Sequence, residues 1–201
     1  VTGGTVDVAD AAAIQGISGY VDSTASSYDI VDSASAIVGA TDAILNTGGV
    51  ATVTVSGVAD AAQGADIDAF VKDVTYNVVD DANDIAAELS GSNDQLDEAV
   101  SVTVTGGTVD VADAAAIQGI SGYVDSTASS YDIVDSASAI VGATDAILNT
   151  GGVATVTVSG VATAAQGADI DGFSKDVVFN VVDDAQDVIC LLYTSPSPRD
   201  P

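Results

Sequence analysis

The chain has 201 residues, of which 30 are acidic and three are basic, giving a formal net charge of −27 without any histidine. Apolar residues make up 47% of it, too large a share for a disordered acidic tail, so we expect a folded core with an acidic surface. Such a surface repels polyphosphate, which excludes nucleic acid as a partner, and no run approaches the roughly 18 apolar residues of a membrane span. We therefore predict no membrane insertion.

A long internal repeat dominates the sequence. Val1–Ala59 recurs letter for letter as Val104–Ala162, a period of 103 residues. We predict a first repeat copy at 1–103 and a truncated second copy at 104–189, within a fragment of a longer tandem-repeat protein. A recent duplication, or a sequence assembly that joined similar repeats, would explain the identity.

Each copy divides into two related half-units, at about 1–50 and 51–103. Both contain a VTV-like segment, the motif VADAA, an aromatic-bearing stretch and an Ala-rich segment that ends in Leu. VTVT at 102–105 alternates apolar and polar residues, which predicts a strand with the valines on one face and the threonines on the other. YDIVD at 28–32 and TYNVVD at 75–80 are β-branched and aromatic, and are also predicted as strands.

Helices are predicted in the Ala-rich segments between these strands. The spacing of Ala12, Ile14 and Ile17 is typical of one helical face, as is that of Ile37, Ala40 and Ile44. DDANDIAAEL at 80–89 begins with acidic residues that would cap free N–H groups. The tripeptide TGG and the dipeptide SG are expected to mark breaks between elements.

This order places a strand about every 25 residues, with a helix between strands. Short βα steps cannot bury their faces alone, so they must stack on neighbouring repeats of the same chain. Right-handed crossovers would produce a parallel sheet covered by helices. The predicted fold class is α/β, a repetitive βα solenoid-like stack with parallel strands, and an all-β solenoid is the alternative. Tyr20, Tyr28, Phe70 and Tyr76 are expected in the core, with carbohydrate stacking as their alternative role.

The last residues, 190–201, differ from everything before them. CLLYTSPSPRDP holds the chain's one Cys, its one Arg and all three Pro. CLLYTSPSPRD resembles the in-frame translation of a transposase-based sequencing adapter, so we predict a non-native, adapter-derived tail. The remaining chain then has no cysteine for a disulfide or a thiolate metal site.

Several segments resemble repeats of known bacterial proteins: AAQGADID at 61–68 and 164–171, FVKDVTYNVVDDANDIAA at 70–87, and AILNTGG at 146–152. They are similar to repeats in giant cell-surface and secreted proteins of aquatic bacteria, including cyanobacterial swimming-motility surface proteins and large adhesins exported by type I secretion. The resemblance implies an extracellular or cell-surface location. The nonapeptide of the calcium β-roll is absent, so that mode of calcium binding is not implied.

Carboxylates are the candidate chemical groups. The weak metal-ligand candidates are Asp80, Asp81 and Asp84, with their copies Asp183, Asp184 and Asp187, and further acidic pairs lie at Asp66 and Asp68 and at Asp169 and Asp171. They could supply oxygen ligands for Ca²⁺, but no D-x-D-x-D-G loop is present, so we expect helix capping and solvation instead. No other cofactor is predicted. Lys72 and Lys175 each precede an Asp, which predicts a local ion pair, with a ligand contact as the alternative.

We predict that the protein is not an enzyme, because the native part lacks the His, Cys and Arg that usually serve as bases, nucleophiles and oxyanion clamps. The predicted function is a structural and adhesive repeat module of a large exported cell-surface protein, acting as a spacer or surface-layer segment. The alternative is a ligand-binding module that recognises cell-surface carbohydrate or calcium. Flat ladders of threonine that bind ice or a crystalline polysaccharide are a further hypothesis for the VTV strands.

Overall fold

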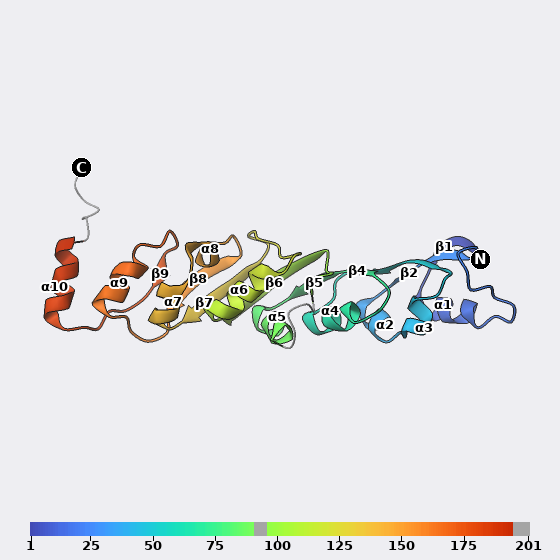
Figure 1. The fold of residues 1–201 in the computed structure, drawn as a ribbon, viewed down its shortest axis with the longest axis horizontal. Coiled ribbons are helices and arrows are strands. Elements are labelled where there is room, and N and C mark those ends of the chain that lie inside the picture. Colours follow the sequence, from blue (N-terminus) through green and yellow to red (C-terminus); the bar gives the residue numbers. More distant parts are fainter. Residues whose placement is uncertain (91–95, 195–201) are drawn as a thin grey trace.

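The computed structural model describes residues 1–90 and 96–194, with side chains described up to Ile189. Strands and helices follow one another along a single long axis, with the two ends of the chain far apart (Figure 1). The first copy contains β1 (Thr2–Val6), α1 (Val8–Gln15), β2 (Ser27–Asp32), α2 (Ala34–Val38), α3 (Asp42–Leu45), β3 (Val50–Val55), α4 (Ala61–Asp68), β4 (Val74–Thr75), β5 (Asn77–Asp80) and α5 (Ala82–Leu89). Then come β6 (Ser101–Val109), α6 (Val111–Gly119), β7 (Ser130–Asp135), α7 (Ala137–Gly142), α8 (Asp145–Leu148), β8 (Val153–Val158), α9 (Ala164–Ile170), β9 (Val177–Val178) and α10 (Ala185–Thr194).

The strands form two all-parallel sheets, ordered β1-β2-β3-β4 and β5-β6-β7-β8-β9. β4 and β5 belong to one extended segment that is interrupted at Tyr76, and this segment links the sheets. On its first-sheet side, Ala59 N donates to the Asn77 carbonyl at 2.8 Å and Val79 N donates to the Ala59 carbonyl at 3.0 Å. The prediction of an α/β stack with parallel strands is confirmed, and the all-β alternative is wrong because helices connect the strands.

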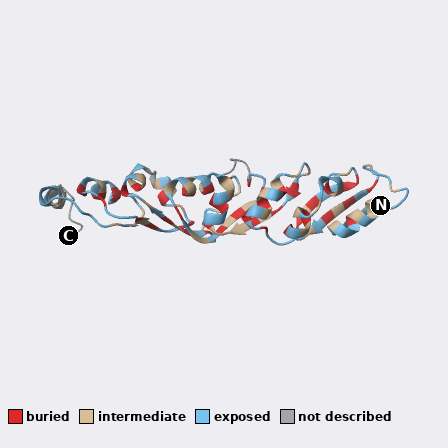
Figure 2. Ribbon diagram, turned by 90° about the horizontal axis from the view of Figure 1, so that it is seen from below, coloured by how far each residue is buried: buried red, intermediate tan, exposed pale blue. Residues whose placement is uncertain are grey.

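One face of each strand supplies the core. Val102 and Val104 are fully buried, whereas Thr103 is partly and Thr105 fully exposed, as their alternation predicts. Apolar side chains pair from strand to strand in two matching rows, Val6–Ile30–Val53–Val74 and Val109–Ile133–Val156–Val177. Buried residues therefore run along the molecule from α1 to α9 instead of gathering at one centre (Figure 2). Each such Val or Ile contributes about 1.5–3 kcal/mol when fully buried.

Two predicted helical faces are corrected by the structure. α1 ends at Gln15, so Ile17 lies beyond the helix and is 60% exposed, while Ala11 is the residue of α1 that is fully buried. The segment around Ile37 and Ile44 is not one helix but two. Gly39 ends α2 and the following chain is extended at Thr41 before α3 begins. Glycine has a low helix propensity, and Leu45 is the buried residue of α3.

The TGG tripeptide has two different structural roles. At 47–49 it lies in the turn before β3, as expected, but at 2–4 and 105–107 it lies inside β1 and β6. Gly106 and Gly107 have φ of 122° and 90°, and the register with β7 shifts between Thr105 and Thr108. Two glycines with positive φ thus form a bulge, so the prediction of a break was wrong at these two places.

Partly buried polar contacts tie α1 and α6 to the βα step that follows each of them. Gln15 Nε2 donates to the Tyr28 hydroxyl at 2.8 Å and to the Ile44 carbonyl at 2.9 Å. Gln118 makes the same two contacts in the second copy, to Tyr131 at 2.7 Å and to the Ile147 carbonyl at 2.9 Å. Tyr28 and Tyr131 are each 1% exposed, which confirms the predicted core position of this aromatic residue.

A substitution at Gly49 tests this packing. The Tyr20 hydroxyl oxygen is buried without a hydrogen-bond partner, and a Cβ added at Gly49 would overlap it. Gly49→Ala is therefore expected to destabilise the protein by about 1–3 kcal/mol, measured as a lower denaturation midpoint by circular dichroism. Gly142→Ala is the control, because a Cβ added there would have no neighbour within 4 Å. Adding Tyr20→Phe should recover part of the loss; equal midpoints for the two glycine variants would contradict this account.

Candidate functional site

Aspartates gather where the helices begin. Asp7, Asp60, Asp81 and Asp110 are the N-cap residues of α1, α4, α5 and α6, and each accepts a hydrogen bond from the amide three residues later. These bonds are 2.7 to 3.1 Å long. An N-cap of this kind typically contributes about 1 kcal/mol, because it satisfies an amide that has no partner inside the helix.

A second set of aspartates joins neighbouring βα steps. Asp80 ends β5, and its Oδ2 accepts from the Ala61 amide in the first turn of α4 at 2.9 Å. Its Oδ1 accepts from the Asp81 amide at 2.9 Å. The same pair of bonds is made by Asp32 to Val8 and Ser33, by Asp135 to Val111 and Ser136, and by Asp183 to Ala164 and Asp184. We call Asp32, Asp80, Asp135 and Asp183 the bridging aspartates.

The bridging aspartates recur once in each half-unit. Asp80 and Asp183 are among the metal candidates predicted from the sequence, whereas Asp32 and Asp135 are not. A signal was available, because all four end a stretch of the form I/V-V-D that follows an aromatic residue. The amide that donates to Oδ2 of each bridging aspartate lies 19 to 24 residues earlier in the chain. Local spacing could therefore not have identified this contact.

The structure brings the predicted metal candidates together. The carboxylates of Asp80, Asp81 and Asp84 offer oxygen atoms within 4.8 Å of one another, and Asp183, Asp184 and Asp187 form the equivalent group. We call these two groups the aspartate triads. Both oxygens of Asp80 accept from amides, and Asp81 Oδ1 accepts from the amides of Asn83 and Asp84. A Ca²⁺ ion takes six to eight oxygen ligands, so a triad could supply only part of its shell.

Negative charge is concentrated at the first triad. The charge of Asp81, followed by that of Asp80, raises the pKa of Asp84 above its usual value. Asp84 is exposed, so water moderates this repulsion. A bound cation would relieve the repulsion within the triad, and so would screening by salt. The geometry of the triad is compatible with both.

The other predicted acidic pairs do not join a triad. Asp66 is exposed on α4, and Asp68 accepts a hydrogen bond from the Tyr76 hydroxyl at 3.3 Å. Burial, and after it the charge of Asp68, raises the pKa of Tyr76. The copies Asp169 and Asp171 lie at the end of α9, where Phe179 replaces Tyr76 and offers no hydroxyl.

The two lysines contact the backbone. Lys72 Nζ donates to the carbonyls of Val50 and Ala51 at 3.0 and 3.1 Å, and Lys175 Nζ donates to the carbonyl of Val153 at 2.6 Å. β4 pairs with β3 only at Val53 and beyond, so these earlier carbonyls receive an ammonium in place of a strand N–H. The contact differs from the predicted ion pair with the adjacent aspartate.

The uncovered face of the sheet, which we call the outer face, mixes residue types. Thr52 donates from its hydroxyl to Asp29 at 2.6 Å, and Thr155 donates to Asp132 at the same distance. Val31 and Val134, each 36% exposed, lie in the same strands as these aspartates. Threonines are thus interrupted by carboxylates and valines, which argues against a flat threonine ladder for ice.

Fold and contacts together define the class of the fold: α/β, with two all-parallel sheets and helices between the strands. Comparison of the chain with protein families, with curated proteins and with solved structures gave no match. Among the described residues, no helix has the length and apolar character needed to cross a membrane. Of the predicted tail, 195–201 lies outside the described residues, while the backbone of 190–194 continues α10.

Replacing a bridging aspartate should weaken the stack. Asp80→Asn keeps the shape but leaves one of two amides facing an NH₂ group, so we expect a loss of about 2 kcal/mol, typical of hydrogen bonds to a charged group. Asp66→Asn removes the same charge from an exposed position and is the matched control. The measurement is the chemical denaturation midpoint at neutral pH. A midpoint for Asp80→Asn equal to that of the control would show that the bridging contact contributes nothing.

Proposed function

We propose that this chain is a structural and adhesive repeat module of a large exported cell-surface protein, acting as a spacer or surface-layer segment. The observation that carries the proposal is the packing of β5 and α5, near the end of the first copy, on β6, which runs from the first copy into the second, and on α6. We call this contact the junction. There β5 and β6 pair in parallel, with Val78 opposite Val102 and Asp80 opposite Val104. The junction is therefore made of the same parallel ladder as the interior of each copy.

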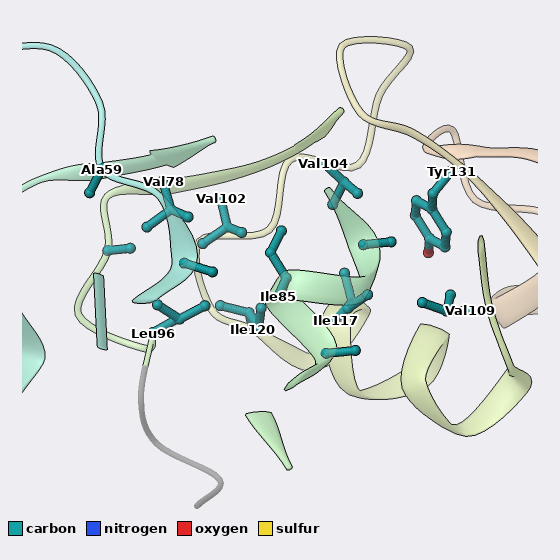
Figure 3. Close-up of a cluster of buried hydrophobic side chains, with 14 of the residues drawn as sticks. Ala59, Val78, Ile85, Leu96, Val102, Val104, Val109, Ile117, Ile120 and Tyr131 are labelled. Carbon is teal, nitrogen blue, oxygen red and sulfur yellow. The ribbon is translucent and has the colours of Figure 1, made fainter. Parts of the chain in front are cut away.

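The core is also continuous across the junction. Val78, Ile85 and Leu96 are buried together with Ile117 and Ile120 of the second copy (Figure 3). Leu96 lies in the connection between α5 and β6, and thus between the two copies. A further copy could add to the array through an identical contact, which is the property that a spacer needs.

The proposed spacer gains length by repetition of the copy. Each copy adds four strand positions, and parallel strands lie about 4.8 Å apart, so 103 residues lengthen the array by roughly 19 Å. An extended chain of the same length would reach much further. What the stack contributes is thus stiffness and not reach. Its acidic surface keeps neighbouring arrays soluble and apart.

An extracellular or cell-surface location is part of the proposal. It is supported by the resemblance of AAQGADID and FVKDVTYNVVDDANDIAA to bacterial surface-protein repeats. A dense negative charge also suits a saline medium, where the Debye length falls below about 10 Å and repulsion is screened. We propose no catalytic role, because the clustered carboxylates are engaged in helix capping and bridging contacts.

A second candidate function is a calcium-binding module. It is favoured by one observation: the aspartate triads recur at equivalent positions in the two copies. Cell-surface carbohydrate is the other candidate ligand of such a module, but Tyr28 and Tyr76 are too deeply buried to stack on a sugar.

The spacer proposal predicts a fixed increment of length. A chain in which residues 1–103 are duplicated should show a maximum dimension larger by about 19 Å in small-angle X-ray scattering, because four more strands join the same ladder. The increment should be the same with EDTA and with excess NaCl. Copies joined by a flexible connection would instead give a smaller and salt-dependent increment, which would count against the proposal.

Thermal unfolding separates the spacer from the calcium module. For a spacer, CaCl₂ should shift the melting temperature only as much as NaCl of equal ionic strength does. A calcium module should show a larger, saturable shift, because a ligand that binds the folded state stabilises it. A chain carrying Asp84→Asn and Asp187→Asn is the control, since it removes one carboxylate from each triad and should abolish any calcium-specific shift.

A further inference from the structure

Exposed side chains line up across the strands on the outer face. Tyr28 and Ile30 of β2 are buried, so the side chain of Asp29 between them points the other way, to the outer face. Parallel sheets are usually covered on both faces, whereas Thr5 and Thr52, which flank Asp29 in β1 and β3, are exposed. The outer face thus presents its side chains in rows that run across the strands.

Hydroxyl and carboxylate groups alternate in one of these rows. Thr5 pairs with Asp29, and Thr52 Oγ1 donates to Asp29 Oδ1 at 2.6 Å. Asp73, which directly precedes β4, is exposed beside Thr52. We call these four residues the first outer row. Their counterparts form the second outer row: Thr108, Asp132, Thr155 and Asp176.

Each outer row carries negative charge at a fixed interval. Its two aspartates are two strands apart, which places them about 10 Å from each other, with a threonine hydroxyl between them. Neither row contains a basic residue, and Lys72 and Lys175 are bound to carbonyls of β3 and β8. The charge complement of an outer row is therefore a ligand that carries cationic groups at the same interval.

A row without charge runs beside each outer row. Val31 pairs with Thr54, and Val134 pairs with Thr157, two positions further along the same strands. Val31 and Val134 are each 36% exposed, so their methyl groups reach the surface. A ligand that covers both rows must combine a cationic edge with a face of C–H groups.

We propose that the outer face binds a linear polysaccharide of β-1,4-linked glucosamine. Successive sugars of such an extended chain point their amino groups to opposite sides, so every second ammonium group faces the same way. The length of one disaccharide is close to the interval between the two aspartates of a row, so these ammonium groups meet both of them. The C–H groups of the sugar rings then cover the neighbouring valines and threonines.

Other cationic partners fit the outer face less well. An extended basic peptide binds a sheet by adding a strand to a free edge, whereas the outer rows offer side chains only. A calcium-bearing mineral would leave the valine methyl groups without a contact. This inference rests on the adhesive part of the proposed function and names its ligand, while the spacer role does not depend on it.

Isothermal titration calorimetry of the full chain with a glucosamine hexamer tests the proposal. The titration is made at slightly acidic pH, where the amines are protonated and the carboxylates remain ionised. Saturable binding is expected. The N-acetylated hexamer has the same chain without ammonium groups. It should bind about tenfold more weakly or worse, since a hydrogen bond to a charged group contributes about that factor.

Two matched double variants locate the site. Asp73→Asn with Asp176→Asn removes one carboxylate from each outer row and should weaken binding of the glucosamine hexamer about tenfold. Asp66→Asn with Asp169→Asn removes the same charge from exposed positions of α4 and α9, away from the outer face. This control should change the affinity less than about twofold, because only screened long-range attraction is lost. Circular dichroism verifies that both variants are folded.

A lysine hexamer measures what charge alone contributes, and the two double variants should weaken its binding equally. The proposal is overturned if the glucosamine hexamer does not bind saturably, or if the N-acetylated hexamer binds equally well. It is also overturned if both double variants weaken glucosamine binding equally, or if the lysine hexamer shows the same preference for the outer rows. The scattering increment is measured on the chain without ligand, so none of these results bears on the spacer.

Discussion

A parallel β-strand leaves N–H and C=O groups unpaired along both of its edges, and this requirement organises the whole molecule. Each edge here is satisfied by the strand of the next βα step, which needs a connection long enough to return to the same end of the sheet. At the junction, Val100 N donates to the Tyr76 carbonyl at 2.9 Å and Val102 N to the Gly122 carbonyl at 2.8 Å. The spacing of strands, the short helices and the elongated shape all depend on meeting this requirement repeatedly.

The same topology explains how the fold tolerates 30 acidic residues. In a parallel stack every helix connects strands in the same sense, so the helix N-termini collect along one edge. Free amides and the positive ends of the helix dipoles favour carboxylates there. The bridging aspartates use this by accepting from two amides each. The cost is mutual repulsion, visible in the raised pKa of Asp84. Capping and bridging contacts are by themselves enough to bring these carboxylates together.

Sequence patterns predicted those strands and helix caps that depend on neighbouring residues. They failed for the features that contacts between distant residues decide. Alternation identified β6, and the acidic start of DDANDIAAEL identified the N-cap Asp81. The shared motif VADAA, however, aligns Asp10 with Asp60, whereas the N-caps are Asp7 and Asp60. The end of the preceding strand decides where each helix begins, and β1 ends at Val6. In the first half-unit the Asp of VADAA therefore lies three residues after the N-cap, whereas in the second half-unit it is the N-cap itself.

Identical sequence in two surroundings separates what the chain encodes locally from what its neighbours add. β2 and β7 have the same bounds and burial pattern, so local sequence and intracopy contacts suffice for them. α1 and α6 differ: α6 extends to Gly119, one residue beyond the counterpart of α1, and Ile117 is fully buried where Ile14 is only partly so. Because α5 packs on α6, the helix gains its last residue and its core from the preceding copy. The first copy forms the same elements without that neighbour, so a preceding repeat adds burial to the helix and does not decide the fold.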